Sequence, residues 1–132
     1  MTLEASVLRA DAVHASPGGY RIDVHLPWYR SLPLSCLEDV TVRLDGEIAD
    51  SGALRVRHDG RDLTLAELPD LVDDQWFVQD PVQVVVADGS PVPAGGDVDV
   101  EITLAVRIPY IIIGPQTALV QRARVQRKVV VQ

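Results

Sequence analysis

Apolar and polar residues alternate along much of this chain, and this period of two predicts β-strands. The clearest case is the run 97–110, whose intervening positions are mainly acidic residues, threonine and arginine. Its apolar face would consist of Val98, Val100, Ile102, Leu104, Val106 and Ile108. We expect strands near 4–14, 20–27, 38–45, 53–58, 61–64, 82–87, 97–110 and 118–131, separated by turns rich in Gly, Pro and Asp. The pattern predicts an all-β fold: a two-sheet, mainly antiparallel β-sandwich of about eight strands in a single domain over residues 1–132.

Only residues 66–73 have a helical character, and Pro69 limits this segment to about one turn. Thr64, followed three residues later by Glu67, fits a capping box. We expect this short helical turn in a crossover between the two sheets, which continues through Trp76. The two long strands at the C-terminal end would occupy the middle of the sandwich.

The alternation breaks at Ile111, Ile112 and Ile113, which follow Tyr110 and precede Gly114. A strand segment that is apolar on both faces is either buried on both sides or forms an exposed hydrophobic patch. A domain of this size has little room for a doubly buried strand end, and exposed apolar patches commonly mark interfaces. We therefore predict that Tyr110 and the three isoleucines belong to a partner surface rather than to the core.

Composition adds limits to this picture. Hydrophobic residues make up 47% of the chain but aromatic residues only 5%, so the core must be mostly Val, Leu and Ile. No apolar run approaches the roughly 20 residues of a membrane helix, and the first residues do not resemble a signal peptide. The single cysteine, Cys36, cannot form an internal disulfide. These features predict a cytoplasmic protein with no membrane association.

The net charge of −7 argues against nucleic acid as a partner, because phosphate binding requires a basic surface. The charge is unevenly distributed, since residues 121–132 contain Arg122, Arg124, Arg127 and Lys128 and no acidic residue. This basic segment is expected to pair with acidic neighbours in its own sheet, although docking onto an acidic partner surface is the alternative.

The candidate chemistry of the chain is sparse. His25 and Asp23 lie two residues apart on one strand face, and with Glu101 they are the best available metal ligands. A histidine beside an aspartate on a solvated strand is a more common explanation. Cys36 lies between Leu34 and Leu37, a context typical of a buried thiol rather than a nucleophile. We predict no catalytic residue and no metal site in this chain.

A loop between two predicted strands contains Trp28, Tyr29 and Arg30 and is stiffened by Pro27 and Pro33. Two aromatic residues and an arginine on a rigid loop have the composition of an interface hot spot. The alternative is that the aromatic rings cap the end of the β core. The residues alone do not separate these two interpretations.

Three segments also carry a resemblance to a known family. They comprise Leu26-Pro27-Trp28-Tyr29-Arg30 with Pro33-Leu34-Ser35, Leu37-Glu38-Asp39 and Asp45-Gly46-Glu47; Trp76-Phe77 before a valine-rich strand; and Arg107-Ile108-Pro109-Tyr110. In order, spacing and total length the chain resembles the β subunit of bacterial C-glycoside deglycosidases. The first segment is fairly specific, whereas the other two would be weak alone.

The resemblance implies a small, non-catalytic subunit that works with a metal-dependent TIM-barrel α subunit in a hetero-oligomer. Such complexes act as carbon–carbon lyases on C-glycosides, including those of flavonoids. They cleave the bond between a 3-oxo sugar and an aromatic aglycone by proton removal beside the ketone, followed by elimination. The divalent metal, manganese, and the catalytic bases would belong to the α subunit, and this chain itself would hold no cofactor. The candidate partner-interface residues are Trp28, Tyr29, Arg30, Trp76, Tyr110, Ile111, Ile112 and Ile113.

Two other classes of function remain open from the sequence. A stand-alone carbohydrate-binding module would use Trp28, Tyr29 and Trp76 as a sugar platform, which requires exposed and coplanar rings. A self-sufficient metalloenzyme on a β-sandwich would require a tightly bound metal in the single chain.

Overall fold

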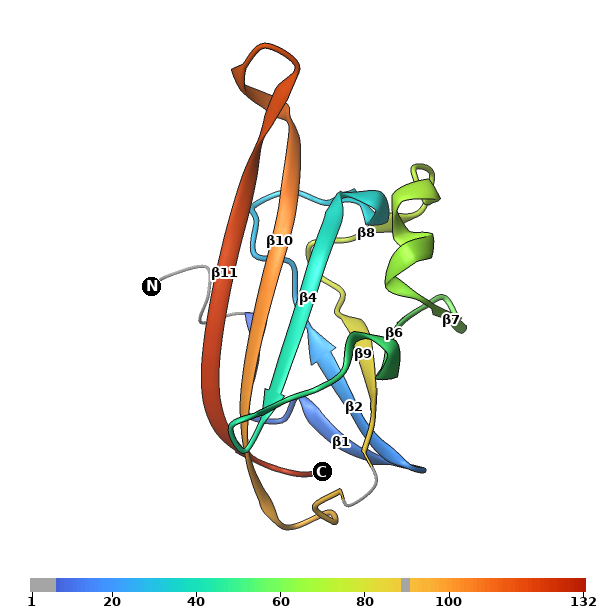
Figure 1. Ribbon diagram of the computed structural model, residues 1–132, viewed down its shortest axis with the longest axis vertical. Coiled ribbons are helices and arrows are strands. Elements are labelled where there is room, and N and C mark those ends of the chain that lie inside the picture. The colour runs from blue at the N-terminus through green and yellow to red at the C-terminus, as the bar shows by residue number, and fades with distance from the viewer. Residues whose placement is uncertain (1–6, 89–90) are drawn as a thin grey trace.

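Two antiparallel sheets form the body of the molecule in the computed structural model, which describes residues 7–88 and 91–132 (Figure 1). The first sheet contains, in spatial order, β1 (Val13–Ser16), β2 (Gly19–Val24), β9 (Val82–Ala87), β6 (Leu54–His58) and β7 (Arg61–Leu63). The second contains β11 (Thr117–Val130), β10 (Asp97–Gly114), β4 (Leu37–Leu44) and β5 (Glu47–Ile48). The two-residue strands β3 (Leu32–Pro33) and β8 (Gln75–Trp76) pair separately. The all-β, mainly antiparallel sandwich predicted from the sequence is confirmed.

The core lies between the two sheets, where their apolar faces meet. The six alternating residues of β10 from Val98 to Ile108 are each at most 1% exposed. They belong to one apolar cluster with the inward residues of the opposite sheet, which include Tyr20, Ile22 and Val24 of β2 and Val82, Val84 and Val86 of β9. Alternation along a strand therefore identified the buried face correctly, because successive side chains point to opposite sides of a sheet.

Each of the eight predicted strands corresponds to a strand of the structure, but the first was placed incorrectly. The prediction near 4–14 begins in residues 4–6, which lie outside the described part of the chain. Residues 7–12 are not a strand, and β1 begins only at Val13. The Ala12 amide donates to the Arg9 carbonyl at 3.2 Å, so a turn replaces the ladder here. Val7 and Leu8 are nevertheless fully buried, which explains why their pattern resembled a strand.

The connection between β7 and β8 contains the expected helical turn, but it is not a crossover between the two sheets, because the flanking strands β7 and β9 both belong to the first sheet. The turn is a 3₁₀ helix, η3 (Leu65–Asp70), with Pro69 inside it. The Thr64 amide donates to the Glu67 carboxylate at 3.0 Å, which confirms the capping box. Two shorter 3₁₀ turns, η1 (Leu34–Cys36) and η2 (Ser51–Ala53), precede β4 and β6. No helix of the described residues is long and apolar enough to cross a membrane.

Strands β10 and β11 form a long hairpin that projects beyond the body of the sandwich (Figure 1). β10 continues to Gly114, past the predicted end at residue 110. The pairing register with β11 shifts between Ile108 and Ile112, where the strand leaves the core. β11 lies at the edge of its sheet and not in the middle as expected, because among the described strands only β10 pairs with it.

The basic strand β11 pairs with acidic residues of its own sheet, as predicted. Arg124 donates two hydrogen bonds to the Glu101 carboxylate, at 3.0 and 3.1 Å. Gln126 donates a hydrogen bond to Asp99, the acidic residue that precedes Glu101 by two positions on β10. Both contacts are diagonal across the strand pair, because in the backbone register Glu101 lies opposite Gln126 and Thr103 lies opposite Arg124.

Candidate partner surface and an adjacent pocket

The aromatic loop after β2 is tied to the distant strand β10. The indole nitrogen of Trp28 donates a hydrogen bond to the Tyr110 hydroxyl. Trp28 is half-buried and packs against the core, whereas Tyr29 and Arg30 are exposed. The Trp28 and Tyr29 rings contact each other, with centroids 5.4 Å apart. Two segments that the sequence singled out independently are therefore one structural feature.

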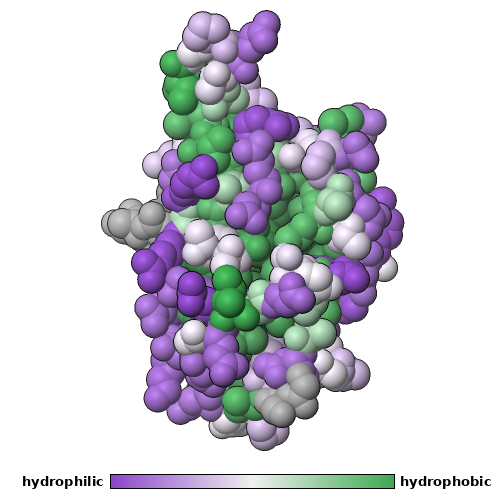
Figure 2. Space-filling model, viewed as in Figure 1, coloured by the Kyte–Doolittle hydropathy of each residue, from purple (hydrophilic) through white to green (hydrophobic). Residues whose placement is uncertain are grey.

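Beyond Tyr110, the projecting hairpin exposes large apolar side chains. Tyr110, Ile112 and Ile113 are each more than half exposed. Ile111 differs, because it is partly buried and packs against the core. In Figure 2 hydrophobic side chains lie along the lower part of the projection, beneath a more hydrophilic tip, and a further hydrophobic area lies in the middle of the body between hydrophilic sides. Exposed apolar residues in such a position are typical of an interaction site.

We call the combined feature the apical surface. It consists of Trp28, Tyr29, Arg30, Tyr110, Ile112 and Ile113. Five of these six residues are exposed, and Trp28 joins the loop to the hairpin. The surface is apolar and aromatic with one cation, a composition enriched at the centres of interfaces.

Trp76, expected on the partner surface, lies in the core instead. Its side chain is only 1% exposed, and its indole nitrogen donates to the Asp80 carbonyl at 3.1 Å. Its neighbour Phe77 is 55% exposed and was not among the predicted residues. Adjacent residues of an extended segment point to opposite sides, so only one aromatic ring of the pair is directed inward. The sequence signalled an aromatic pair but not which member faces solvent.

The three rings proposed for a sugar platform do not form one. The Trp28 and Tyr29 rings are inclined by 58° to each other, and Trp76 is buried. An exposed, coplanar arrangement was the feature that would have favoured a stand-alone carbohydrate-binding module of this kind. The structure therefore removes that platform.

The candidate metal ligands His25, Asp23 and Glu101 are not brought together. Asp23 lies in the first sheet, with its Oδ2 atom 3.0 Å from Nε2 of His14. Glu101 lies in the second sheet, where its carboxylate accepts a hydrogen bond from Arg124. His25 is buried, and its Nδ1 has no hydrogen-bond partner among the described residues. Loss of hydration on burial lowers the pKa of His25, which favours the neutral imidazole.

A different group of titratable side chains is assembled at the β6–β7 turn. Ligand atoms of His58, Asp59 and Asp74 lie within 4.8 Å of one another. Arg61 is 2.8 Å from Asp74, and His58 is 3.6 Å from Asp59. Asp74 is therefore already engaged by a cation, the Arg61 guanidinium.

Cys36 is buried, as its apolar neighbours predicted. Burial is the main cause that raises the pKa of the Cys36 thiol, so the protonated form dominates near neutral pH. The Arg107 guanidinium lies 4.0 Å from the sulfur and opposes this shift only in part. A protonated, buried thiol is a poor nucleophile.

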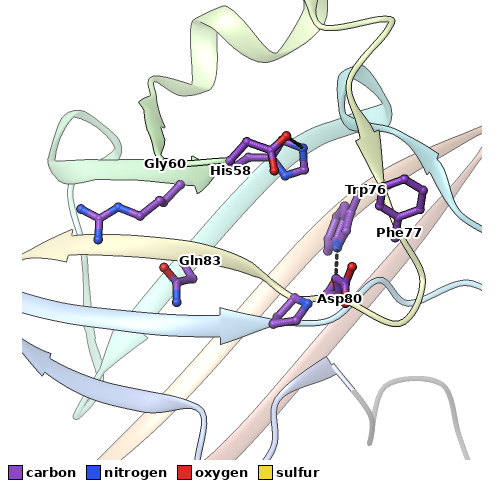
Figure 3. Close-up of a pocket in the computed structure, with 9 residues that line it drawn as sticks. His58, Gly60, Trp76, Phe77, Asp80 and Gln83 are labelled. Carbon is purple, nitrogen blue, oxygen red and sulfur yellow. Dashed lines mark hydrogen bonds and ion pairs between the residues drawn. The ribbon is translucent and has the colours of Figure 1, made fainter.

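A pocket of about 320 Å³ opens beside the apical surface, between β6, β8 and the start of β9 (Figure 3). Its lining is mixed, with aromatic, acidic, amide and basic side chains. The lining residues are Arg57, His58, Asp59, Gly60, Trp76, Phe77, Asp80, Pro81 and Gln83. The Val78 amide donates to the Ser31 hydroxyl at 2.8 Å, which holds the pocket's aromatic segment against the loop that bears Tyr29 and Arg30. The pocket has no local signature in the sequence, because its lining residues come from segments that are far apart along the chain.

Comparison with known proteins gives consistent results. A family model described as the C-glycoside deglycosidase beta subunit matches residues 2–110. The chain is 36% identical over 130 residues to a C-glycoside deglycosidase beta subunit of Arthrobacter globiformis, which covers 98% of each protein. It is 37% identical to a 3'-dehydrocarminate deglycosidase beta subunit of a Microbacterium species, over 80% of this chain and 78% of that protein. A C-glycoside deglycosidase beta subunit of Microbacterium trichothecenolyticum is 33% identical, over 89% of this chain and 84% of the relative.

Proposed function

Because this chain belongs to the family of C-glycoside deglycosidase beta subunits, we propose that it is the small, non-catalytic subunit of a C-glycoside-cleaving complex. The observation that carries the proposal is the similarity to a C-glycoside deglycosidase beta subunit over 98% of each chain. The partner in this proposal is a TIM-barrel α subunit that contains a divalent metal, manganese, in a cytoplasmic hetero-oligomer.

The proposed reaction cleaves the carbon–carbon bond between a 3-oxo sugar and an aromatic aglycone. A base of the α subunit would remove a proton beside the ketone, and the aglycone would leave by elimination, which makes the complex a lyase. The name of the Microbacterium relative specifies a 3'-dehydro compound, in keeping with an oxidised sugar. Flavonoid C-glycosides are the proposed substrates of the complex.

A supporting role is in keeping with the state of this chain's own reactive groups. Cys36 is buried beside Arg107, and His25 is buried with a lowered pKa. His14 pairs with Asp23.

The apical surface is the proposed docking site for the α subunit. Tyr29, Ile112 and Ile113 expose apolar area that a partner would remove from water, and this is the main source of association free energy. The hydrogen bond between Trp28 and Tyr110 braces the loop against the hairpin before any partner arrives. Such preorganisation reduces the entropy lost on docking.

Co-expression with a TIM-barrel partner encoded beside this chain tests the proposal. The two proteins should co-elute in size-exclusion chromatography, and only the complex should cleave a 3-oxo C-glycoside in the presence of manganese. Turnover by the pure chain comparable with that of the complex would refute the non-catalytic role. Separate elution under conditions where the α subunit is folded would refute the partnership.

A further inference from the structure

The pocket beside the apical surface is built by three segments that are remote in sequence. The end of β6 and the following turn supply Arg57 through Gly60, β8 supplies Trp76, and the segment into β9 supplies Asp80 and Gln83. β6 and β9 are paired, with Arg57 opposite Gln83, so the pocket floor is part of the first sheet. Figure 3 shows His58 on one side of the hollow and Trp76 and Asp80 on the other. A volume of about 320 Å³ is sufficient for one small ring.

The charges of the pocket disfavour an anionic ligand. The Arg57 guanidinium is already bound by two hydrogen bonds to the Asp62 carboxylate, at 2.7 and 3.1 Å. Its charge is therefore neutralised from outside the pocket. Asp59 and Asp80 contribute two carboxylates to the lining, so a phosphate or carboxylate would meet net repulsion.

The acidic and amide side chains of the pocket offer acceptor oxygens, and Arg57 and His58 add nitrogen atoms to the lining. The Gln83 amide nitrogen donates to Asp23 at 3.1 Å, which leaves its oxygen as the group available to a ligand. Trp76 donates to the Asp80 backbone, and the Asp80 carboxylate accepts no hydrogen bond from any described residue. A complementary ligand must therefore present several donors, as hydroxyl groups do.

The remaining lining is apolar and includes the exposed ring of Phe77, together with Pro81 and the edge of Trp76. A sugar ring has hydroxyl donors around its rim and apolar C–H groups on its faces, and both features match this lining. We propose that this pocket binds a single pyranose ring, with hydroxyls directed to Asp59, Asp80 and Gln83. The site goes beyond the proposed function, because a supporting subunit need not hold a sugar itself. The Val78–Ser31 hydrogen bond places a sugar bound here beside the proposed α-subunit surface.

Titration of the full ¹⁵N-labelled chain with methyl β-D-glucopyranoside tests the site directly. Saturable shifts are expected at the Trp76 indole, the Gly60 amide and the Gln83 side chain, with a Kd in the millimolar range. Asp80→Asn should weaken binding about tenfold, since a hydrogen bond to a charged carboxylate is replaced by one to a neutral amide. Phe77→Ala should weaken it by a similar factor and remain folded, because 55% of this side chain is already exposed. Asp97→Asn, an exposed carboxylate at the start of β10, is the matched control and should bind as the parent does.

Three outcomes would overturn the inference. They are the absence of saturable shifts, equal weakening by Asp97→Asn, and equal or stronger shifts with tetramethylammonium, which would show recognition of charge rather than of hydroxyls. Assembly with the α subunit, measured on the same variants, separates this inference from the proposed function. A pocket variant that no longer binds sugar but still assembles supports a sugar site that is separate from the docking surface. Failure of the parent chain to assemble would refute the proposed partnership and would leave the sugar site unaffected.

Discussion

Ile112 provides the sharpest test of the apical surface, because the chain contains a matched control for it. Ile112 is 62% exposed on the projecting hairpin, and Ile48 on β5 is 60% exposed at another position. The two residues have the same chemistry and nearly the same exposure. A difference between their substitutions must therefore arise from location.

The expected magnitude follows from the exposed area. Burying a whole isoleucine side chain is worth about 1.5–3 kcal/mol. Since 62% of Ile112 is available to a partner, its burial should contribute about 1–2 kcal/mol to assembly. Ile112→Ala should then raise the Kd for the α subunit roughly 5- to 30-fold. Ile112→Asp should weaken assembly further, because a carboxylate would be dehydrated without a partner.

Subunit affinity and thermal unfolding of the isolated chain are the two measurements required. Both Ile112 variants should unfold within about 0.5 kcal/mol of the parent, as exposed substitutions usually do. The Ile48 substitutions should change neither stability nor affinity. Equal losses of affinity at the two positions would refute the assignment of the apical surface. Unfolding of the isolated Ile112→Asp chain would show instead that this residue belongs to the core.

Three further predictions follow from individual contacts. Tyr110→Phe removes the acceptor of the Trp28 indole hydrogen bond and should lower the free energy of unfolding by about 1 kcal/mol. Tyr29→Phe, which removes a hydroxyl from an exposed side chain, is the control and should leave the free energy of unfolding unchanged. Trp76→Ala should cost about 3–5 kcal/mol of stability in denaturant titration, since a buried indole leaves a cavity; a small loss would place Trp76 outside the core. A hydrogen bond from Arg124 lowers the pKa of Glu101 below its ordinary value of 4.5. The charged Glu101 therefore stabilises the fold at pH values above 4.5, and this stabilisation is lost as the pH falls through the lowered pKa of the folded state. Melting temperatures of Glu101→Gln should therefore depend less on acidic pH than those of the parent, and an unchanged dependence would contradict the assignment.

The fold was largely predictable because most strands bury one face. A half-buried strand of six or more residues produces a detectable period of two, as in β10. The strands β3, β5 and β8 have two residues each, which is too short for any period to appear. The segment 7–12 misled the prediction because Val7, Leu8 and Ala12 are buried, while the backbone turns between Arg9 and Ala12.

The candidate site was predictable only in part, since it depends on contacts between remote residues. Trp28 and Tyr110 were singled out separately, but their hydrogen bond spans 82 positions and has no local signature. The inward direction of Trp76 and the exposure of Phe77 follow from the pairing of Trp76 with Leu32, which is equally remote. Composition identifies which residue types are suited to an interface, whereas strand pairing decides which of them reach the surface.

The projecting hairpin explains why a domain with a complete core would expose isoleucines at all. The fully buried face of β10 ends at Ile108. Beyond it Ile111 still packs against the core and Tyr110 accepts from Trp28, whereas Ile112 and Ile113 are exposed on the paired strands. A two-stranded ribbon is marginally stable by itself, so the projection depends on the long paired segment that continues it into the sandwich. Trp28 supports its base through Tyr110, which keeps the exposed side chains at a defined position. An apolar projection held in this way is costly in water but loses little entropy when a partner covers it, and this balance favours an assembly role over a purely structural one.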